Sequence, residues 1–153
     1  MPSSSLLTKL QAAPLREDGL RRFLVLLLFG VSFAVYLSCL SAEFVMDDYL
    51  HVLANPWIKN PKHLPEIFGG SLWSYGGGDT SLYRPLIHVL FMGTYFLFGS
   101  DPMGFHLLNL LLHAGVSVLF FLLAAQILRR RESSTPSAAM LAAFSASMLF
   151  ATP

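Results

Sequence analysis

Charged residues are scarce in this sequence of 153 residues. Asp, Glu, Lys and Arg together make up 12% of it, about half the share that a soluble domain carries. Hydrophobic residues make up 54%, and they gather in blocks close to the length that crosses a bilayer. A soluble domain of this size needs a polar shell, which so few polar residues cannot supply. The composition therefore predicts an integral membrane protein.

Several motifs that would indicate other functions are missing. The single cysteine, Cys39, cannot form an intramolecular disulfide. The sequence contains no CxxC pair, no HExxH helix and no glycine loop with phosphate-binding spacing; the three glycines at 76–78 form a simple run that is typical of a loop. The net charge is +1, and no basic stripe with interleaved aromatic residues is present. Nucleic acid is therefore not an expected partner.

The apolar blocks divide the chain into alternating membrane and polar segments. We expect an all-α membrane fold with about three transmembrane helices and a long outer loop that contains short helices. Within that loop, the apolar stretch 86–98 is too short to cross a bilayer and predicts an interfacial helix. In chain order the expected segments are a cytosolic tail at 1–22, a transmembrane helix at 23–42, a periplasmic or lumenal loop at 43–104, a transmembrane helix at 105–128, a cytosolic turn at 129–137, and the start of a third transmembrane helix at 138–153.

Arginine residues predict the orientation of these segments. Arg16, Arg21 and Arg22 precede the first apolar block, and the run 129–131 follows the second. Cytoplasmic loops carry an excess of Lys and Arg, so the N-terminus and the arginine run are expected in the cytosol. The loop at 43–104, which holds six of the nine acidic residues, then faces outward.

Two adjacent acids, Asp47 and Asp48, open this loop in the stretch "EFVMDDYLHVLANP". A structural interpretation is that either acid caps a short helix that begins near Tyr49. A functional interpretation is that one acid serves as a general base, taking the proton from an acceptor hydroxyl. Adjacent helical residues point about 100° apart, so at most one acid faces a substrate, while the other caps, binds a cation or hydrogen-bonds the acceptor. A divalent metal is possible here only with ligands from elsewhere, because two acids do not make a site.

Polar residues further along the chain are additional candidates. Arg84, in "LYRPL", is suited to binding a phosphate with two parallel hydrogen bonds. The structural alternatives are a surface arginine or one that is paired with Asp47 or Asp48. His106, Asn109, His113 and Ser117 share one face of the second long apolar block, which indicates interhelical hydrogen bonds or a polar cavity. His106 and His113 lie two turns, about 10 Å, apart. That separation is too large for one shared metal ion, and no metal site is predicted from them.

The order of these parts resembles a known family. The stretches "EFVMDDYLHVLANPWI" and "SLYRPLIHVLFMGTYFLFGSDPMGFHLLNLLLHA", followed by a basic stop, resemble the N-terminus of the membrane O-mannosyltransferases that carry tetratricopeptide repeats, and their bacterial relatives. These are GT-C type enzymes that use polyprenyl-phosphate sugars. The resemblance implies that Asp47, with Asp48 second, is the catalytic base or an acceptor-positioning group. It implies that Arg84 contacts the lipid phosphate or shapes the loop, and it makes His106, Asn109 and His113 candidate substrate-binding residues whose role is open.

The resemblance also implies a particular function and setting. Such enzymes have around ten spans, and a His-Pro-x-His-Thr-Glu-like motif follows the third; here the sequence ends at "LFATP". We therefore expect a truncated part of a multi-pass GT-C-like bundle, inactive by itself. The complete enzyme is expected to transfer a sugar, mannose by resemblance, from a polyprenyl-phosphate donor to a protein hydroxyl at the outer membrane face. Its expected partners are the lipid-linked donor, a protein or glycan acceptor and membrane lipid, with no certain cofactor. The resemblance alone favours the bacterial inner membrane over the endoplasmic reticulum.

Two further classes of function fit the same residues. A non-catalytic membrane module would bind a partner through the outer loop, with Trp57 and Trp73 as its anchors. A transporter fragment would use the stripe from His106 to His113 as a path for protons or a solute. The first alternative predicts that Asp47 tolerates substitution, and the second predicts that histidine substitutions abolish uptake.

Overall fold

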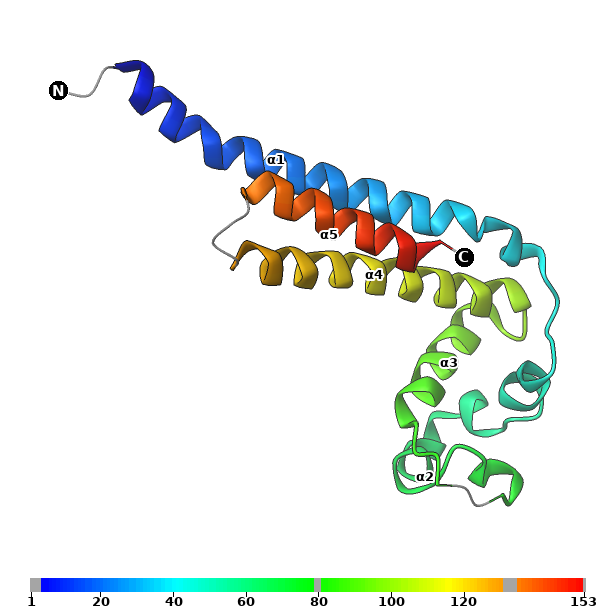
Figure 1. The fold of residues 1–153 in the computed structure, drawn as a ribbon. Coiled ribbons are helices and arrows are strands. Elements are labelled where there is room, and N and C mark those ends of the chain that lie inside the picture. The colour runs from blue at the N-terminus through cyan, green and yellow to red at the C-terminus, as the bar shows by residue number, and fades with distance from the viewer. Residues whose placement is uncertain (1–3, 79–80, 131–134, 153) are drawn as a thin grey trace. The chain divides into compact units, whose positions relative to one another are not determined.

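The computed structural model describes residues 4–78, 81–130 and 135–152, and all regular elements among these residues are helices. This confirms the predicted all-α class (Figure 1). The α-helices are α1 (Ser4–Val35), α2 (Leu64–Gly69), α3 (Pro85–Phe98), α4 (Pro102–Arg129) and α5 (Pro136–Ala151). Within the described ranges, α4 is the one helix that is both long and apolar enough to cross a membrane. The total number of membrane spans stays a prediction.

The chain forms two compact units, which are described separately. The first unit comprises residues 1–37 and 110–153, and the second comprises residues 38–109. In the first unit, α5 packs beside α1 and beside the part of α4 from residue 110 onward (Figure 1). The core between these helices contains Leu28, Phe121 and Ala143, all fully buried.

Small residues allow α5 to pack closely in this unit. Thr135 caps the helix, its side-chain oxygen accepting a hydrogen bond from the Ala138 N–H at 3.3 Å. One face of α5 then repeats every four residues with small buried side chains, Ala139, Ala143, Ser147 and Ala151. The hydroxyl of Ser147 donates to the Ala143 carbonyl at 2.8 Å, so this buried polar group is satisfied within the helix. Such a face is typical of helices packed tightly inside a bilayer.

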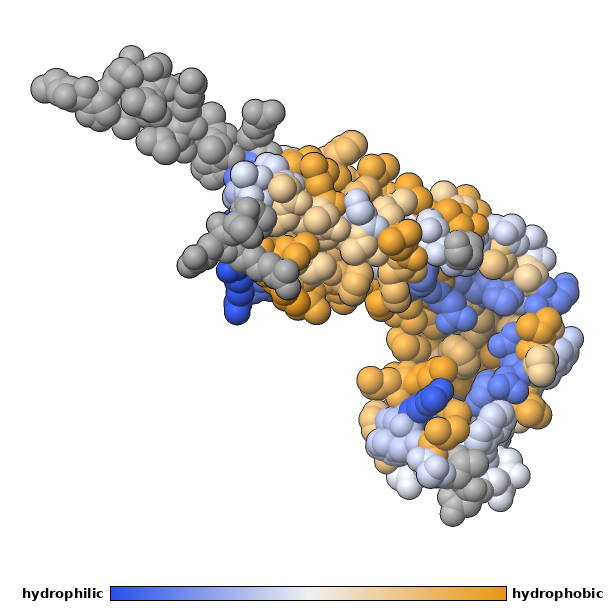
Figure 2. Space-filling view, viewed as in Figure 1, coloured by the Kyte–Doolittle hydropathy of each residue, from blue (hydrophilic) through white to orange (hydrophobic). Residues whose placement is uncertain are grey.

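The outer surface of the first unit is strongly apolar. Leu26, Leu119 and Leu149, one from each of its three helices, are 72%, 65% and 83% exposed. Figure 2 shows hydrophobic residues covering much of this unit's visible face. A monomeric soluble protein rarely exposes such continuous apolar surface, whereas lipid tails are a suitable solvent for it.

The second unit is built from short helices around α3. A π-helix at Tyr49–Leu53 and 3-10 turns at Trp57–Lys59, Pro61–His63 and Ser74–Gly76 accompany α2 and α3. Six buried side chains form its core: Phe44, Val52, Ile58, Ile67, Met92 and Phe105. Residues from 44 to 105 therefore share a hydrophobic core, and Phe44 and Val52 of that core flank the acid pair in the sequence.

A tight reversal connects α3 to α4. Gly99 ends α3 with φ +64°, a left-handed conformation that glycine adopts without strain, and its N–H donates to the Tyr95 carbonyl at 2.7 Å. Asp101 then accepts a hydrogen bond from the Met103 N–H at 3.0 Å as α4 begins. A Cβ at Gly104 would lie 2.5 Å from the ring of Phe98, so only glycine permits this approach.

The first helix differs in its bounds from the predicted segment 23–42. α1 begins at Ser4 and ends at Val35, and a 3-10 helix follows at Leu37–Ser41. The Ser41 hydroxyl donates to the Ser38 carbonyl at 3.0 Å, which fits the three-residue spacing of a 3-10 turn. Apolar composition identified this stretch, but composition does not separate an α-helix from a 3-10 helix.

Candidate functional site

The two adjacent acids are arranged differently by the backbone. Met46, just before them, has φ +44°, an uncommon left-handed conformation for a residue other than glycine. The Asp48 carboxylate accepts a hydrogen bond from the Val45 N–H at 3.1 Å, and the Asp48 N–H donates to the Val45 carbonyl at 3.0 Å. Asp48 therefore closes the turn, while the side chain of Asp47 is exposed.

His51 lies one helical turn beyond Asp47 and is half-buried. Its ring lies against that of Trp73, with centroids 4.3 Å apart and an interplanar angle of 33°. Burial lowers the pKa of His51 below its ordinary value; the charges of Asp47 and Asp48 oppose this effect, and that of Arg84 adds to it. Both acids and Arg84 therefore lie near enough for their charges to affect this imidazole.

An aromatic cluster, defined as His51, Trp57, Trp73, Tyr75 and His88, surrounds this position. Tyr75 lies centrally, with ring centroids 6.4 Å from His51, 6.1 Å from each tryptophan and 5.9 Å from His88. Burial, and secondarily the charge of Asp47, raises the pKa of Tyr75. Its hydroxyl is buried without a hydrogen-bond partner among the described residues. The rings of this cluster meet at tilted or edge-to-face angles, and those of Trp57, Trp73 and Tyr75 are only half-buried, so they can contact the apolar face of a sugar.

Asn55 connects two members of the aromatic cluster, Trp57 and His88. It is fully buried, its amide nitrogen lies 3.1 Å from Nδ1 of His88, and its oxygen accepts the Trp57 N–H at 2.9 Å. Burial lowers the pKa of His88, against a raising effect of the Leu72 backbone, and nearby His51 lowers it further. The Nε2 atom of His88 is buried without a hydrogen bond among the described residues. This arrangement favours a neutral imidazole.

Arg84 is positioned by the residues on either side of it. The Leu82 carbonyl accepts the Leu72 N–H at 2.7 Å, and the Tyr83 hydroxyl donates to the Phe68 carbonyl at 2.9 Å. Pro85 then starts α3 with Arg84 as its N-cap residue. The Arg84 side chain is exposed, and in the part of the chain that the structure describes it has no carboxylate ion-pair partner. Its charge is therefore available to an anion.

The histidine face of the second apolar block is divided between the two units. α4 is continuous through His106, Asn109 and His113. Asn109 is exposed, and His106 lies 6.4 Å from Phe44 between ring centroids, with a buried Nε2 that has no hydrogen bond among the described residues. His113 belongs to the first unit, where Nε2 lies 3.2 Å from the Ala151 carbonyl and the ring contacts Tyr36 and Phe150. His113 therefore ties α4 to the end of α5.

Within the described ranges, no group of three or more His, Cys, Asp or Glu residues could hold a metal ion. Asp47 and Asp48 are the only acids whose charges act on His51 there, and Asp48 already closes its turn. The expectation of a divalent ion completed by further ligands is left untested by this arrangement.

Sequence reasoning missed His51, Asn55, Tyr75 and His88. His51 carried a usable signal, because it follows Asp47 by four residues and so faces the same side of a helical turn. The other three carried none, since their neighbourhood depends on contacts between residues far apart in the chain. Trp57 and Trp73 were noted only as partner-binding anchors; both are half-buried within the aromatic cluster.

Comparisons with known proteins give a consistent result. The chain is 30% identical to a protein O-mannosyl-transferase of Caenorhabditis elegans over 89% of its length, 31% identical to protein O-mannosyl-transferase Tmtc1 of Drosophila melanogaster over 74%, and 32% identical to the human protein O-mannosyl-transferase TMTC3 over 71%. It spans 19%, 14% and 12% of those three relatives. No protein-family model matches it. No solved structure matches it significantly. These three relatives are animal proteins, so the bacterial location stays a prediction without support from them.

Proposed function

Because this chain belongs to the protein O-mannosyl-transferase family over the stretch that it shares with those relatives, we propose that it forms the N-terminal membrane part of a glycosyltransferase. The complete protein transfers mannose from a polyprenyl-phosphate donor to a Ser or Thr hydroxyl at the outer membrane face. The acceptor is a protein, and the chain is one part of a multi-pass helical bundle. The reaction requires residues that lie in the rest of the relatives' length.

The reaction is a single displacement at the anomeric carbon of the mannose. The acceptor hydroxyl oxygen forms a bond to that carbon while the bond from the carbon to the phosphate oxygen breaks. The Asp47 carboxylate takes the hydroxyl proton, and the polyprenyl phosphate leaves with the electron pair of the broken bond. One displacement inverts the configuration at the carbon. Arg84 meets the negative charge of the departing phosphate.

The uncommitted side chain of Asp47 is the observation that carries this proposal. Its neighbour Asp48 is occupied with the Val45 N–H, whereas Asp47 is exposed and influences both His51 and Tyr75. A base must reach the substrate, and the Asp48 carboxylate is already held by the Val45 N–H, which leaves Asp47 as the better placed acid of this turn. Arg84 lowers the pKa of His51, whereas Asp47 raises it. A base and an anion-binding group thus both influence this imidazole, which supports the proposed site.

The aromatic cluster provides a sugar-binding surface in this proposal. The ring of Trp73 packs on His51, next to the turn that carries Asp47. Mannose presents apolar C–H faces that pack on aromatic rings, and Trp57, Trp73 and Tyr75 are half-buried, so part of each side chain is open to such a ligand. His106, Asn109 and His113 have no role in the transfer step that we propose.

The donor assignment is tested with membranes that contain the whole protein of which this chain is part. Polyprenyl-phosphate mannose should give mannosylated acceptor protein with inverted configuration, and a soluble nucleotide-linked mannose should give none once endogenous lipid carrier is removed. Transfer from the nucleotide sugar alone would overturn the proposed donor. Adding EDTA to the same assay tests the divalent-ion expectation.

A further inference from the structure

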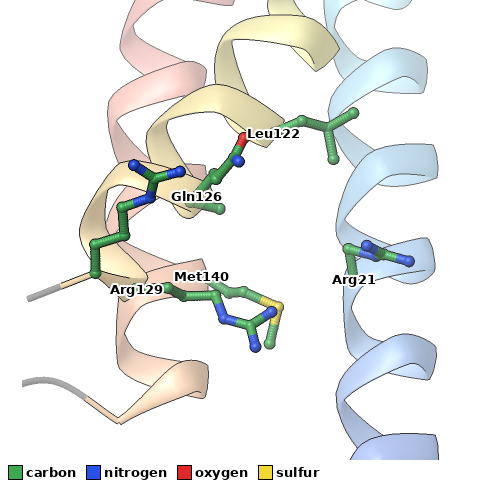
Figure 3. A pocket seen from close by; sticks show the side chains of 7 residues that line it. Arg21, Leu122, Gln126, Arg129 and Met140 are labelled. Carbon is green, nitrogen blue, oxygen red and sulfur yellow. The ribbon is translucent and has the colours of Figure 1, made fainter.

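A cavity of about 460 Å³ lies in the first unit, remote in sequence from the acid pair. Seven residues line it, from three helices: Arg21 of α1; Leu122, Ala125, Gln126 and Arg129 of α4, with Arg130 directly after that helix; and Met140 of α5. Figure 3 shows Arg21 on one side and Gln126 and Arg129 on the other, with Met140 contributed by the third helix. The cavity volume falls within the range of small-molecule sites.

The charge of this cavity is positive and largely uncompensated. Arg129 and Arg130 have no ion pair with an acid in the part of the chain that the structure describes. Arg21 lies 3.4 Å from Asp18, but both side chains are more than half exposed, and a guanidinium has five N–H donors, so donors remain for a ligand. Gln126 adds an amide that can donate to the same ligand. Carboxylate and phosphate are the anions whose geometry such forked donors match, and phosphate is the one that membrane phospholipids carry.

The walls indicate that the phosphate belongs to a lipid. Leu122, Ala125 and Met140 provide an apolar side to a cavity whose other side is cationic. The outer surface of the same unit is apolar, with Leu26 and Leu119 mostly exposed. A free phosphate ion gains nothing from an apolar wall, whereas a phospholipid places its phosphate among the arginines and its glycerol and first methylene groups against the hydrophobic side.

We propose that this cavity binds the phosphate headgroup of an anionic phospholipid. The site holds the basic end of the three-helix unit at one membrane face and is separate from the residues assigned to transfer. Phosphatidic acid, whose headgroup is an unsubstituted phosphate, has the simplest chemistry that fits it.

Arginines at the end of an apolar helix also have two roles that need no ligand. They set the orientation of the helix in the membrane, and they suit the negative end of the helix dipole. Both roles depend on the total charge near the helix end and not on a cavity. Arg21 and Arg22 separate these roles from lipid binding, because they are neighbours on α1 with the same charge and only Arg21 lines the cavity.

The test is a binding titration of the purified chain in zwitterionic detergent micelles, followed by native mass spectrometry. Short-chain phosphatidic acid, short-chain phosphatidylcholine and inorganic phosphate are the three probes. We expect saturable binding of phosphatidic acid, at most weak binding of phosphatidylcholine, and little competition by inorganic phosphate. Arg21→Gln and Arg129→Gln should each weaken the binding of phosphatidic acid about fivefold. Arg22→Gln should leave this binding unchanged.

A variant that keeps every charge completes the test. Leu122→Trp fills the cavity without altering the arginines or the membrane orientation that they set. It should also weaken the binding of phosphatidic acid. Equal losses in Arg21→Gln and Arg22→Gln, or full binding by Leu122→Trp, would overturn the site. Competition by inorganic phosphate at the affinity of the lipid would show a free-phosphate site and overturn the lipid assignment. None of these results depends on mannose transfer, so the proposal stands or fails apart from the proposed function.

Discussion

Asp47 lies one helical turn before His51, and its carboxylate opposes the lowering of the His51 pKa that burial causes. The imidazole packs on Trp73 with ring centroids 4.3 Å apart, so its position is fixed by more than the acid. The charge of Asp47 and the ring of Trp73 thus act on the same imidazole. The same relationship makes the second unit sensitive to pH.

Acidification should destabilise the second unit. His51 and His88 both have a pKa lowered mainly by burial from the ordinary value of 6.5. Below pH 6.5 the unfolded chain binds protons that the folded chain does not. The free energy of unfolding therefore has its full value above pH 6.5 and falls as the pH drops toward the two lowered pKa values. Thermal unfolding in mild detergent should show a lower midpoint at about pH 5.5 than at about pH 7.5.

The variant His51→Gln is the matched comparison for this pH effect. It removes one of the two titrating groups, so its midpoint should change less between the same two pH values than that of the unsubstituted chain. An equal change in both proteins would mean that His51 does not contribute.

The substitution Gly104→Ala should destabilise the reversal between α3 and α4. The added methyl group would lie 2.5 Å from the Phe98 ring, and crowding of this kind costs about 1–3 kcal/mol in the free energy of unfolding. Gly93→Ala is the control, because nothing would lie within 4 Å of the added Cβ. Alanine is also more favourable than glycine within a helix, by about 1 kcal/mol. Denaturant unfolding of both variants measures the difference. A Gly104→Ala variant as stable as Gly93→Ala would contradict the close approach.

The predicted orientation can be tested with single cysteines in sealed membrane vesicles. Cys39 is the only cysteine and is replaced by serine first. Ser81→Cys, in the loop expected outside, should react with an impermeant maleimide added to the outer face. Ser137→Cys, in the turn expected inside, should react only after permeabilisation. Both serines are exposed, so accessibility differs only by the membrane side. Labelling of Ser137→Cys in intact vesicles would mean that the predicted topology is inverted and that Asp47 does not lie at the outer face.

The sequence predicted those features that depend on local pattern. The all-α class follows from long apolar runs, and the helix expected at 105–128 corresponds to α4 at Pro102–Arg129 because its length and composition are unambiguous. The apolar stretch 86–98 corresponds to α3, whose ends are marked by Pro85 and Gly99. The resemblance to the O-mannosyltransferases also followed from motif order, and relatives that are 30% and 31% identical to the chain carry that name.

The composition of the candidate site could not be predicted in the same way. Tyr75 contacts His51, and His88 contacts Asn55, across more than 20 residues of chain, and no local pattern encodes such contacts. The division of roles between Asp47 and Asp48 depends on the left-handed backbone of Met46, a conformation that a residue other than glycine rarely adopts. The sequence predicted only that at most one acid of the pair would face a substrate.

The substitution Asp47→Asn, made in the whole protein, tests the central claim most directly, with Asp48→Asn as its matched control. Loss of a general base slows a reaction by about 10²–10⁴-fold, so Asp47→Asn should reduce mannose transfer from the polyprenyl-phosphate donor by that factor while membrane insertion is retained. Asp48→Asn should retain most transfer, because an amide oxygen still accepts the Val45 N–H. Near-normal transfer by Asp47→Asn would contradict the role of Asp47 as the base.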